Sequence, residues 1–431
     1  MNHDESLAYL ERLTWFGIKA GLDHTRALCR RLGHPERAFP SVLVAGTNGK
    51  GSTAAFLEAI LRASGRRTGL YTSPHLVDVR ERIRVDGAAI SPDGFARVLS
   101  EVREAAENAL KDREVETDPT YFEALTLAAF LHFRGQGVDA AVLEVGLGGR
   151  LDCTNVAPAI LCAVTNVGMD HEEHLGPGLL SIAREKAGIF RPGVPALTGA
   201  RGTWALRILR QEARRRGTRL GLPDWSVEKH GDGWHMAAGT RHLDLPYPAL
   251  PGEHQLGNAA LAVRCAWELD ECGFAIPDQA IRRGILEARW PGRLELVGRE
   301  PDVYLDGAHN LDGCEVLARF VAELPHPRKA LVFAVMRDKP VADMASRLFP
   351  LFGKVWATSV PMGRCLDPAG VRAAWPGELE EMPDPAAALK AAAEWSGREG
   401  VVVAAGSLYL VGYLLGLSRP EGSLNSWGSG L

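Results

Sequence analysis

The sequence has 431 residues, of which 46% are hydrophobic and 24% are charged, and its formal net charge is -4. A chain of this length exceeds what one hydrophobic core usually serves, so we expect two or three domains. The nearly balanced charge excludes a strongly basic or acidic surface, and we therefore expect no nucleic-acid partner and no membrane-surface partner.

Cysteine usage and apolar runs indicate where the protein works. The seven cysteines are scattered without a C-x-x-C pair, which argues against a disulfide framework and a zinc site and favours a reducing compartment. Residues 1–13 are acidic and amphipathic and lack the basic-then-apolar order of a secretory signal. Val401–Leu417, the longest uncharged run, is short for a membrane span and predicts a buried strand that leads into a core helix. We expect a cytoplasmic monomer.

Apolar runs typical of buried strands alternate with amphipathic helical segments along most of the chain. This alternation predicts an α/β fold with a mostly parallel sheet flanked by helices. The clearest predicted strands are Ser41–Ala45, Ala140–Val145, Ile160–Thr165, Val303–Leu305, Ala330–Val335 and Val401–Ala404. The clearest predicted helices are Gly51–Ala63, Tyr121–Arg134, Gln255–Cys272 and Pro277–Glu287.

A change in residue composition and in the predicted secondary structure precedes the predicted domain boundary. Leu220–Gly252 is rich in Gly, Pro and Trp and predicts short antiparallel strands, and the strand–helix alternation restarts after Trp290. We therefore predict a P-loop ATPase domain over residues 1–290 and a smaller Rossmann-like α/β domain over residues 291–431. The segment after Arg419 has the composition of a disordered end.

A phosphate-binding loop follows the first predicted strand. Ser41–Ala45 leads directly into Gly46-Thr47-Asn48-Gly49-Lys50-Gly51-Ser52 and then into a helix. Glycines let backbone N–H groups converge on phosphate oxygens, the helix N-terminus attracts negative charge, Lys50 reaches the terminal phosphates and Ser52 can bind Mg²⁺. The order of strand, loop and helix predicts a nucleotide site.

The spacing of this loop is shorter than the common one. The pattern G-x-x-x-x-G-K-[ST] would need glycine at Val44 and a hydroxyl at Gly51. This difference counts against a GTPase or a nucleotide kinase, and it indicates a separate lineage of P-loops.

Metal-binding side chains follow two further predicted strands. Glu144 ends one strand, where Mg²⁺ on nucleotide phosphates needs a hard oxygen ligand. His171, beside Asp170, follows another strand and is a candidate ligand of a second Mg²⁺, whereas His174 is predicted to be structural. The glycines after Glu144 do not complete a dinucleotide fingerprint, because Leu151 stands where a glycine is needed. The spacing around His171 does not match H-E-x-x-H, which excludes a zinc protease of that type.

Five ordered motifs together resemble the Mur ligase superfamily, and within it the bacterial dihydrofolate synthase/folylpolyglutamate synthase family. The motifs are Gly46–Ser52, Thr72–Leu76, Glu144–Asn155, Thr165–His171 and Glu185–Ile189. The resemblance covers Leu7 to Leu417, and the combination is specific where each motif alone is not. It implies an ATP-dependent ligase that activates a carboxylate as an acyl phosphate and couples it to L-glutamate, with dihydropteroate and reduced folates as acceptors.

The resemblance also implies roles for individual residues. It implies a carbamate on Lys186, which by itself would be interpreted as surface charge, and catalytic roles for Lys50, Lys186 and His171. The implied ligands of two Mg²⁺ ions are Ser52, Ser73, Glu144 and His171. The implied ATP contacts beyond the P-loop are Asn258, Arg293 and Asp306, although the turn at Asp306 could equally end in a helix cap supplied by Asn310.

The pterin site has its own implied residues. By the resemblance they are Thr120, Tyr121, Phe122, Glu123, Leu151, Asp152 and Cys153. Asp152 matches the pattern of bifunctional members, whereas Cys153 stands where Ala or Ser is more usual. On the residues alone, ordinary helix core is the preferred interpretation of Tyr121 and Phe122.

Two alternatives to this function stay open. One is a Mur-type ligase with a different acceptor, which would share the ATP machinery. The other is a P-loop NTPase that hydrolyses nucleotide and joins nothing.

Overall fold

The computed structural model describes residues 1–13 and 21–417. The described chain divides into two compact units, which are considered separately below. Unit 1 comprises Met1–Pro74, Arg80–Ala249 and Glu253–Arg289, and unit 2 comprises His75–Val79, Leu250–Gly252 and the chain from Trp290 onward. The predicted disordered end after Arg419 lies outside the described residues.

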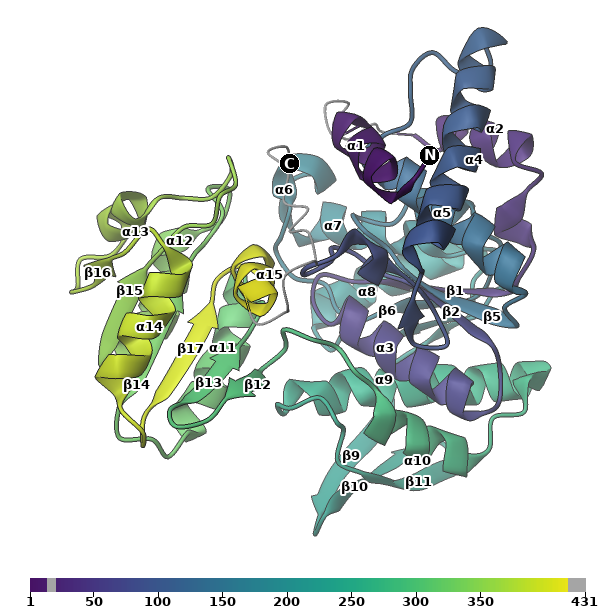
Figure 1. The fold of residues 1–431 in the computed structure, drawn as a ribbon. Helices are drawn as coiled ribbons and strands as arrows, with labels where there is room; N and C mark the ends of the chain where they lie inside the picture. The colour runs from purple at the N-terminus through teal and green to yellow at the C-terminus, as the bar shows by residue number, and fades with distance from the viewer. Residues whose placement is uncertain (14–20, 418–431) are drawn as a thin grey trace. The chain divides into compact units, whose positions relative to one another are not determined.

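Unit 1 is built on an eight-stranded sheet with the order β4-β3-β2-β5-β1-β6-β7-β8 (Figure 1). The strands are β1 Ser41–Ala45, β2 Thr68–Tyr71, β3 Ile83–Val85, β4 Ala88–Ala89, β5 Ala140–Glu144, β6 Ala159–Val164, β7 Ala196–Thr198 and β8 Leu220–Gly221. All pairs from β2 to β8 are parallel, and β3 and β4 pair antiparallel at one edge. Every residue of β1 and β5 is buried, as expected of central parallel strands covered on both faces.

Helices cover both faces of this sheet. They are α1 His3–Leu13, α2 Asp23–Arg31, α3 Lys50–Ala63, α4 Pro92–Lys111, α5 Tyr121–Gln136, α6 Glu172–Leu175, α7 Gly178–Lys186, α8 Thr203–Arg216, α9 His254–Leu269 and α10 Asp278–Glu287. In Figure 1, α3, α9 and α10 lie on one side of the sheet and α4 and α5 on the other. Close packing explains some glycines, because a Cβ on Gly69 in β2 would lie 3.0 Å from the Phe133 ring of α5.

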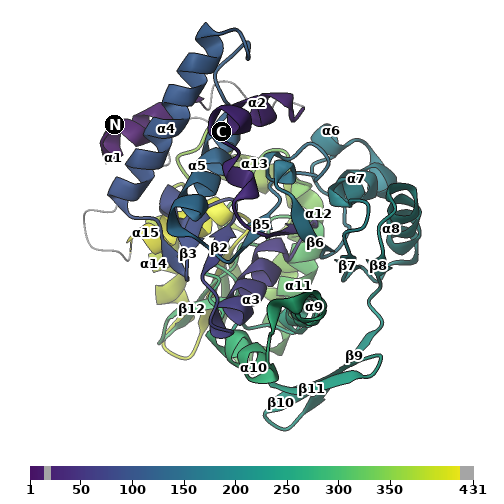
Figure 2. The ribbon, with the colours of Figure 1, turned by 90° about the vertical axis from the view of Figure 1, so that its right-hand side faces the viewer.

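The segment predicted as short antiparallel strands forms a separate three-stranded sheet, β11-β10-β9 (Figure 2). Its strands are β9 Trp225–His230, β10 Gly233–Ala238 and β11 Arg241–Pro246. One face buries Trp234, Met236 and Leu243, whereas the alternate residues face outward. The prediction for Leu220–Gly252 is confirmed.

Unit 2 has a six-stranded sheet with the order β12-β13-β17-β14-β15-β16. The strands are β12 Glu295–Gly298, β13 Asp302–Leu305, β14 Lys329–Phe333, β15 Lys354–Ala357, β16 Glu380–Glu381 and β17 Val401–Ala405, and the helices are α11 Leu311–Glu323, α12 Val341–Leu348, α13 Pro368–Ala374, α14 Pro385–Ser396 and α15 Leu408–Leu417. All strand pairs are parallel except β12 with β13.

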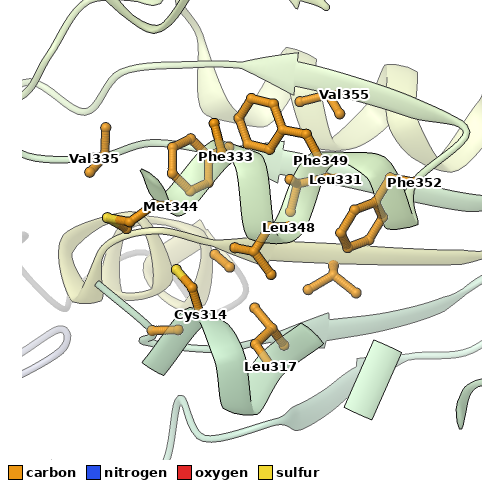
Figure 3. Packing of buried hydrophobic residues seen from close by; sticks show 14 of the residues in the cluster. Cys314, Leu317, Leu331, Phe333, Val335, Met344, Leu348, Phe349, Phe352 and Val355 are labelled. Carbon is orange, nitrogen blue, oxygen red and sulfur yellow. The ribbon is translucent and has the colours of Figure 1, made fainter. Parts of the chain in front are cut away.

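Two apolar clusters flank the sheet of unit 2. One joins it to α11, α12 and α13 and contains Phe333, Leu348 and Phe349 (Figure 3). The other joins it to α14 and α15. The predicted strand and core helix in Val401–Leu417 are confirmed as β17 and α15, and no described helix is long and apolar enough to span a membrane.

Gly284 of α10 offers a test of the packing in unit 1. A Cβ at this position would lie 2.5 Å from the backbone N and Cα of Ile60 in α3, so the two helices must separate to admit it. We expect Gly284→Ala to destabilise unit 1 by about 1–3 kcal/mol, measured as a lower midpoint of thermal or denaturant unfolding. Gly135→Ala in α5 is the matched control, because its Cβ would meet only the Arg97 side chain at 4.0 Å. An equal loss in both variants would contradict the packing argument.

Candidate functional site

The P-loop connects β1 to α3 in unit 1 and requires glycine at two positions. Gly46 and Gly49 have φ angles of 152° and 77°. A Cβ on Gly46 would lie 1.8 Å from Oγ1 of Thr165, and one on Gly49 would lie 2.4 Å from Oδ1 of Asn258. Both backbone conformation and space therefore exclude larger residues.

The segment after β6 holds the P-loop in place through side chains. Oδ1 of Asn166 accepts hydrogen bonds from the N–H groups of Thr47 at 3.1 Å and Asn48 at 2.9 Å. Oγ1 of Thr165 donates to the Asn48 carbonyl at 2.6 Å, and the Thr47 hydroxyl exchanges hydrogen bonds with the backbone of Gly168. These contacts fix the loop from its first residues to the start of α3.

The same contacts divide the P-loop amides into two groups. The N–H groups of Thr47 and Asn48 are engaged by Asn166, whereas the first helical hydrogen bond of α3 runs from Thr53 N to Gly49 O. The first-turn N–H groups at residues 50–52 therefore have no carbonyl partner within the helix and point along its axis toward the loop. Such a helix start is an anion-binding site. Within this loop, the first-turn N–H groups at residues 50–52 are therefore the ones that the helix itself leaves available to an anion.

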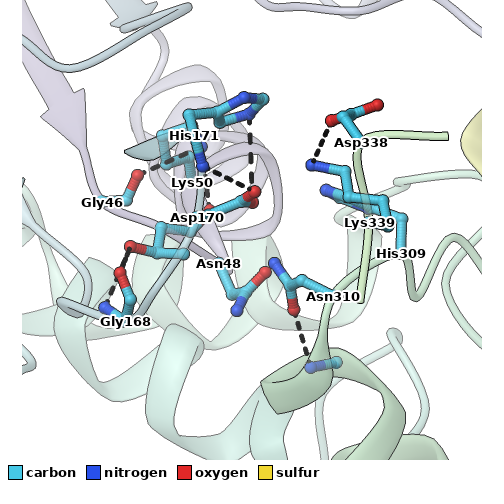
Figure 4. A network of polar contacts seen from close by, with 12 residues as sticks. Gly46, Asn48, Lys50, Gly168, Asp170, His171, His309, Asn310, Asp338 and Lys339 are labelled. Carbon is cyan, nitrogen blue, oxygen red and sulfur yellow. Dashed lines mark hydrogen bonds and ion pairs between the residues drawn. The ribbon is translucent and has the colours of Figure 1, made fainter. Parts of the chain in front are cut away.

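Two lysine ammonium groups meet at one backbone carbonyl. Nζ of Lys50 donates to the carbonyl of Gly46 at 3.2 Å (Figure 4) and to that of Thr47 at 3.0 Å. Nζ of Lys186 donates to Gly46 O at 2.8 Å. Lys186 ends α7 and is only 3% exposed, so its interpretation as surface charge is wrong. Burial, followed by the charge of Lys50, lowers the pKa of Lys186 to about 7, while Asp170 acts in the opposite direction.

Oxygen donors suited to a divalent cation lie at the ends of two strands and at the start of α3. Oε2 of Glu144, at the end of β5, accepts a hydrogen bond from the backbone N–H of Ser73 at 3.0 Å. The hydroxyl of Ser52 accepts a hydrogen bond from Gln255 at 3.4 Å. No group of three or more His, Cys, Asp or Glu residues in the described chain could hold a metal by itself. The set still fits Mg²⁺, which typically takes one or two carboxylates and completes its shell with phosphate oxygens and water.

His171 adopts an unusual backbone conformation beside this loop. Its φ is 54°, and it precedes the short helix α6. Its Nε2 lies 3.9 Å from Oδ2 of Asp170, and its side chain is 39% exposed. The ring is thus placed on the Thr165–His171 segment and is accessible to a ligand.

Asn258 lies against the P-loop from α9. Its amide donates to Oε1 of Gln255 at 2.9 Å, and Gln255 in turn reaches Ser52. Gln255 is fully buried. Because the two residues are three apart on one helix, they share a face, and that face meets the start of α3.

Thr120 and Glu123 of the implied pterin segment build the start of α5. They form a reciprocal capping box, in which each side chain accepts a hydrogen bond from the backbone of the other. The second carboxylate oxygen of Glu123 accepts from Thr25 at 2.9 Å and pairs with His24 at 2.9 Å. Burial alone would raise the pKa of Glu123, but the hydrogen bond and charge of His24 outweigh it and hold this pKa below its usual value. Both carboxylate oxygens of Glu123 are thus already engaged in hydrogen bonds within the protein.

Tyr121 and Phe122 follow Thr120 in the first turn of α5, and both are partly exposed. The Arg82 guanidinium lies 5.3 Å from the centroid of the Tyr121 ring. Phe122 lies 6.0 Å from the ring of Tyr71, and a Cβ on Gly146 would meet it at 2.6 Å. Phe122 therefore packs beneath the loop that follows β5.

Asp152 lies in the loop that follows β5 and holds it through hydrogen bonds to its backbone. Its Oδ2 accepts hydrogen bonds from the N–H groups of Gly146 and Leu147, both at 2.9 Å, and its Oδ1 accepts from the backbone and hydroxyl of Thr154. Burial raises the pKa of Asp152 against these hydrogen bonds. Cys153 beside it is buried as well, and Leu151 is half-buried. Asp152 sets the shape of the loop.

Unit 2 contains the remaining implied nucleotide residues. Asp306, at the end of β13, accepts hydrogen bonds from the N–H groups of Leu294 and Ala308, both at 2.9 Å. Burial raises the pKa of Asp306, and the nearby charge of Arg293 opposes that shift. The Asn310 side chain accepts from Gly313 N at 2.9 Å and caps α11, so the helix-cap interpretation of this turn is confirmed. Within unit 2, Lys339 also pairs with Asp338 at 3.3 Å (Figure 4).

Sequence reasoning did not assign a role to Asn166. Its signal was its place directly after the predicted buried strand Ile160–Thr165. In the structure this strand, β6, pairs with β1. A side chain at that position is therefore close enough to reach the loop amides.

Comparison with known proteins gives consistent matches along the chain. Residues 44–196 match the model of the Mur ligase middle domain, and residues 292–408 match that of the Mur ligase, glutamate ligase domain. The chain is 39% identical over 357 residues to the dihydrofolate synthase/folylpolyglutamate synthase of Bacillus subtilis (strain 168), covering 79% of this chain and 83% of that protein.

Solved structures match in fold over nearly the whole length. E. coli FolC in complex with DHPP and ADP superposes with a TM-score of 0.88 at 32% identity, covering 97% of this chain and 98% of that one. A bifunctional folylpolyglutamate synthase/dihydrofolate synthase with Mn, AMPPNP and L-glutamate bound gives a TM-score of 0.86 at 31% identity, with coverage of 97% and 98%.

Asn166→Ala tests how the P-loop is held. The change removes the side-chain acceptor of the Asn48 amide and leaves the Thr47 amide only its longer bond to the Asn166 backbone carbonyl at 3.3 Å, at a cost of about 1–3 kcal/mol, and loosens the loop. We expect the Kd for ATP, measured by isothermal titration calorimetry, to rise roughly ten-fold or more. Asn108→Ala, on the exposed face of α4, should leave that Kd unchanged. An unaltered ATP affinity in Asn166→Ala would contradict the role given to this side chain.

Proposed function

Because the chain belongs to the dihydrofolate synthase/folylpolyglutamate synthase family of Mur ligases, we propose that its P-loop carries out ATP-dependent ligation of L-glutamate to dihydropteroate and to reduced folates. The protein is an ATP-dependent carbon–nitrogen ligase whose cofactors are ATP and a divalent metal ion. The observation that supports the assignment is the start of α3, where the first-turn amides have no carbonyl partner within the helix and the Lys50 ammonium group lies on the P-loop carbonyl of Gly46.

The reaction proceeds through two displacements. In the first, a carboxylate oxygen of the pterin substrate attacks the γ-phosphorus of ATP, and the bond to the bridging oxygen breaks to release ADP. In the second, the neutral amine of glutamate attacks the acyl carbon and loses one proton to solvent, and the bond from that carbon to the phosphate oxygen breaks to release phosphate. Lys50 and the first-turn amides of α3 stabilise the charge on the transferring phosphoryl group.

The metal ligands form two proposed sets. Ser52, Ser73 and Glu144 would hold one ion, supported by the hydrogen bond that links the last two, and His171 would contribute to a second ion. When bound, the ions neutralise charge on the phosphate oxygens. Asn258, Arg293 and Asp306 stay proposed contacts of ATP. A cytoplasmic location and a monomeric state stay predictions.

The proposed pterin residues serve in two ways. Tyr121 and Phe122 offer partly exposed rings beside the loop after β5, so they are the proposed stacking surface. Thr120, Glu123 and Asp152 would act by shaping the helix start and the loop, because their oxygens already accept hydrogen bonds from the protein. Leu151 and Cys153 would line the pocket that these residues shape.

Lys186 is the proposed site of a carbamate. Carbamylation requires a neutral amine, whose nitrogen attacks the carbon of CO₂ while one proton leaves to solvent. The buried position of Lys186 and its pKa of about 7 supply such an amine at neutral pH. The product is an anionic oxygen donor in a place where an uncompensated cation is costly.

Lys50→Ala should abolish ligation, because it removes the ammonium group that stands at the start of α3 and is proposed to stabilise the transferring phosphoryl group. The measurement is ADP release in the presence of ATP, Mg²⁺, dihydropteroate and L-glutamate. For the wild type, we expect release to require both dihydropteroate and L-glutamate. The matched control is Lys390→Ala, which removes a lysine that is 80% exposed in unit 2 and should retain wild-type turnover.

Two results of this assay would contradict the proposal. Wild-type turnover in Lys50→Ala would show that the P-loop lysine takes no part in the reaction. Nucleotide hydrolysis at the same rate with and without dihydropteroate and L-glutamate would instead favour a P-loop NTPase without ligase activity.

The carbamate has a direct test in ¹³C NMR with ¹³C-bicarbonate. The folded pKa of Lys186 is below its ordinary value, so the amine is protonated and unreactive at pH 6 and largely neutral at pH 8. We expect a carbamate carbon signal that grows as the pH rises through about 7, is absent in Lys186→Ala and persists in Lys390→Ala. A native protein without this signal at pH 8 would refute the modification.

A further inference from the structure

The imidazole ring of His24 joins three segments of unit 1 through its two nitrogens. His24 lies in the first turn of α2, and its Nδ1 lies 2.9 Å from Oε1 of Glu123 in the first turn of α5. Its Nε2 lies 3.0 Å from the backbone carbonyl oxygen of Thr117, in the connection between α4 and α5. The side chain of His24 is 17% exposed. The ring therefore bridges the start of α2, that connection and the start of α5.

The carboxylate of Glu123 can only accept hydrogen bonds at neutral pH. Its Oε1 also accepts from the hydroxyl of Thr25 at 2.9 Å, and its Oε2 accepts from the N–H and the hydroxyl of Thr120 at 2.9 Å and 3.0 Å. Burial alone would raise the pKa of Glu123, but the hydrogen bond and charge of His24, followed by the bonds from Thr120 and Thr25, hold it below its usual value. Glu123 is therefore ionised and has no proton to donate.

Both contacts of the His24 ring are thus made to hydrogen-bond acceptors. A neutral imidazole has one N–H donor and one bare nitrogen, and that bare nitrogen would face the lone pairs of an oxygen at either Glu123 or Thr117. Only the imidazolium form donates from both nitrogens. A hydrogen bond from a charged donor to a carboxylate is also stronger than a neutral one. The geometry therefore fits a protonated His24.

The charged groups around His24 determine how firmly this proton is held. Among the described residues of α2, Asp23 and Arg26 are exposed and pair with each other at 3.2 Å. The starts of α2 and α5 both disfavour a nearby cation, because a helix carries partial positive charge at its N-terminus. The Glu123 carboxylate and the Thr117 carbonyl are therefore the groups that retain the proton. Their contribution is present when His24 is protonated and is lost as the pH rises.

We propose that His24, as an imidazolium, is a positioning residue for pterin binding. The helix start that it holds, Thr120–Glu123, carries Tyr121 and Phe122, the proposed stacking rings. When His24 is neutral, one of its two contacts is lost, and the start of α5 is no longer tied to both neighbouring segments. The inference rests on the proposed function, because it assigns His24 to the binding of the pterin substrate and not to that of ATP.

The protonation state of His24 has a direct readout that needs no ligation. In full-length protein labelled with ¹⁵N at histidine, long-range ¹H–¹⁵N NMR distinguishes an imidazolium ring from both neutral tautomers. The signal that is missing from His24→Gln assigns the residue. We expect both His24 nitrogens to be protonated at pH 7 and the ring to lose one proton as the pH is raised. A neutral His24 ring at pH 7 would overturn the proposal.

Steady-state kinetics of the variant test the positioning role. A glutamine at position 24 is neutral, and its amide does not supply a donor to both acceptors. We expect His24→Gln to raise KM for dihydropteroate about ten-fold at pH 7, with kcat and KM for ATP close to those of the wild type. The matched control is His242→Gln, which changes an exposed histidine of β11 and should keep the wild-type KM for dihydropteroate.

The pH profile separates an effect of charge from a general loss of packing. We expect the ratio of KM for dihydropteroate between His24→Gln and the wild type to fall toward one as the pH passes the His24 midpoint measured by NMR. The reason is that the neutral wild-type ring also lacks its second donor. A ratio that does not change with pH, or equal KM values at pH 7, would contradict the role given to His24.

Failure of this inference differs from failure of the proposed function. Turnover that depends on dihydropteroate, together with a neutral His24 at pH 7, would overturn this inference alone. A wild type without dihydropteroate-dependent turnover would overturn the proposed function and, with it, the pterin role of His24.

Discussion

The hydrogen bonds that the Asn166 side chain accepts from the amides of Thr47 and Asn48 determine where the P-loop points. They turn the first part of the loop toward β6 and leave the start of α3 directed outward. The two positive-φ glycines make this course possible, because side chains at Gly46 or Gly49 would collide with Thr165 or Asn258. Phosphate binding therefore depends on a neighbouring strand as much as on the loop itself.

The second constraint is the meeting of two ammonium groups at the Gly46 carbonyl. Lys50 is expected there in any P-loop, but Lys186 arrives from α7 and is buried. Burial first, and then the charge of nearby Lys50, lowers the pKa of Lys186, so this lysine loses its proton more easily than an exposed one. Because burial disfavours the protonated form of Lys186, this lysine is a neutral and therefore reactive amine at a lower pH than an exposed lysine.

The sequence predicted the elements of the fold well, because its strands are continuous apolar runs and its helices have clear periodicity. The strands at Ser41–Ala45 and Val401–Ala404 were placed within a residue of their observed bounds. Burial of single polar residues was harder to predict. Nothing in the composition around Lys186 distinguishes it from a surface lysine, since its burial results from where α7 packs.

The hydrogen-bonding roles of the predicted pterin residues were equally hard to predict from the sequence. The spacing of Thr120 and Glu123 is that of a capping box, but the additional bonds of Glu123 to Thr25 and His24 join segments about a hundred residues apart, a relation that no local pattern encodes. Asp152 likewise binds the loop in which it lies. Sequence motifs indicated which residues matter, and the structure separates those available to a ligand from those that shape the site.

The strand order of unit 1 bears on how the protein is made. β1 emerges early from the ribosome, yet its neighbours β5 and β6 follow about a hundred residues later, and Gln255, which contacts Ser52, is 203 residues further along the chain. A nascent chain that has only just exposed the P-loop lacks the groups that hold it. The P-loop region therefore completes its hydrogen bonds only after α9 has been synthesised.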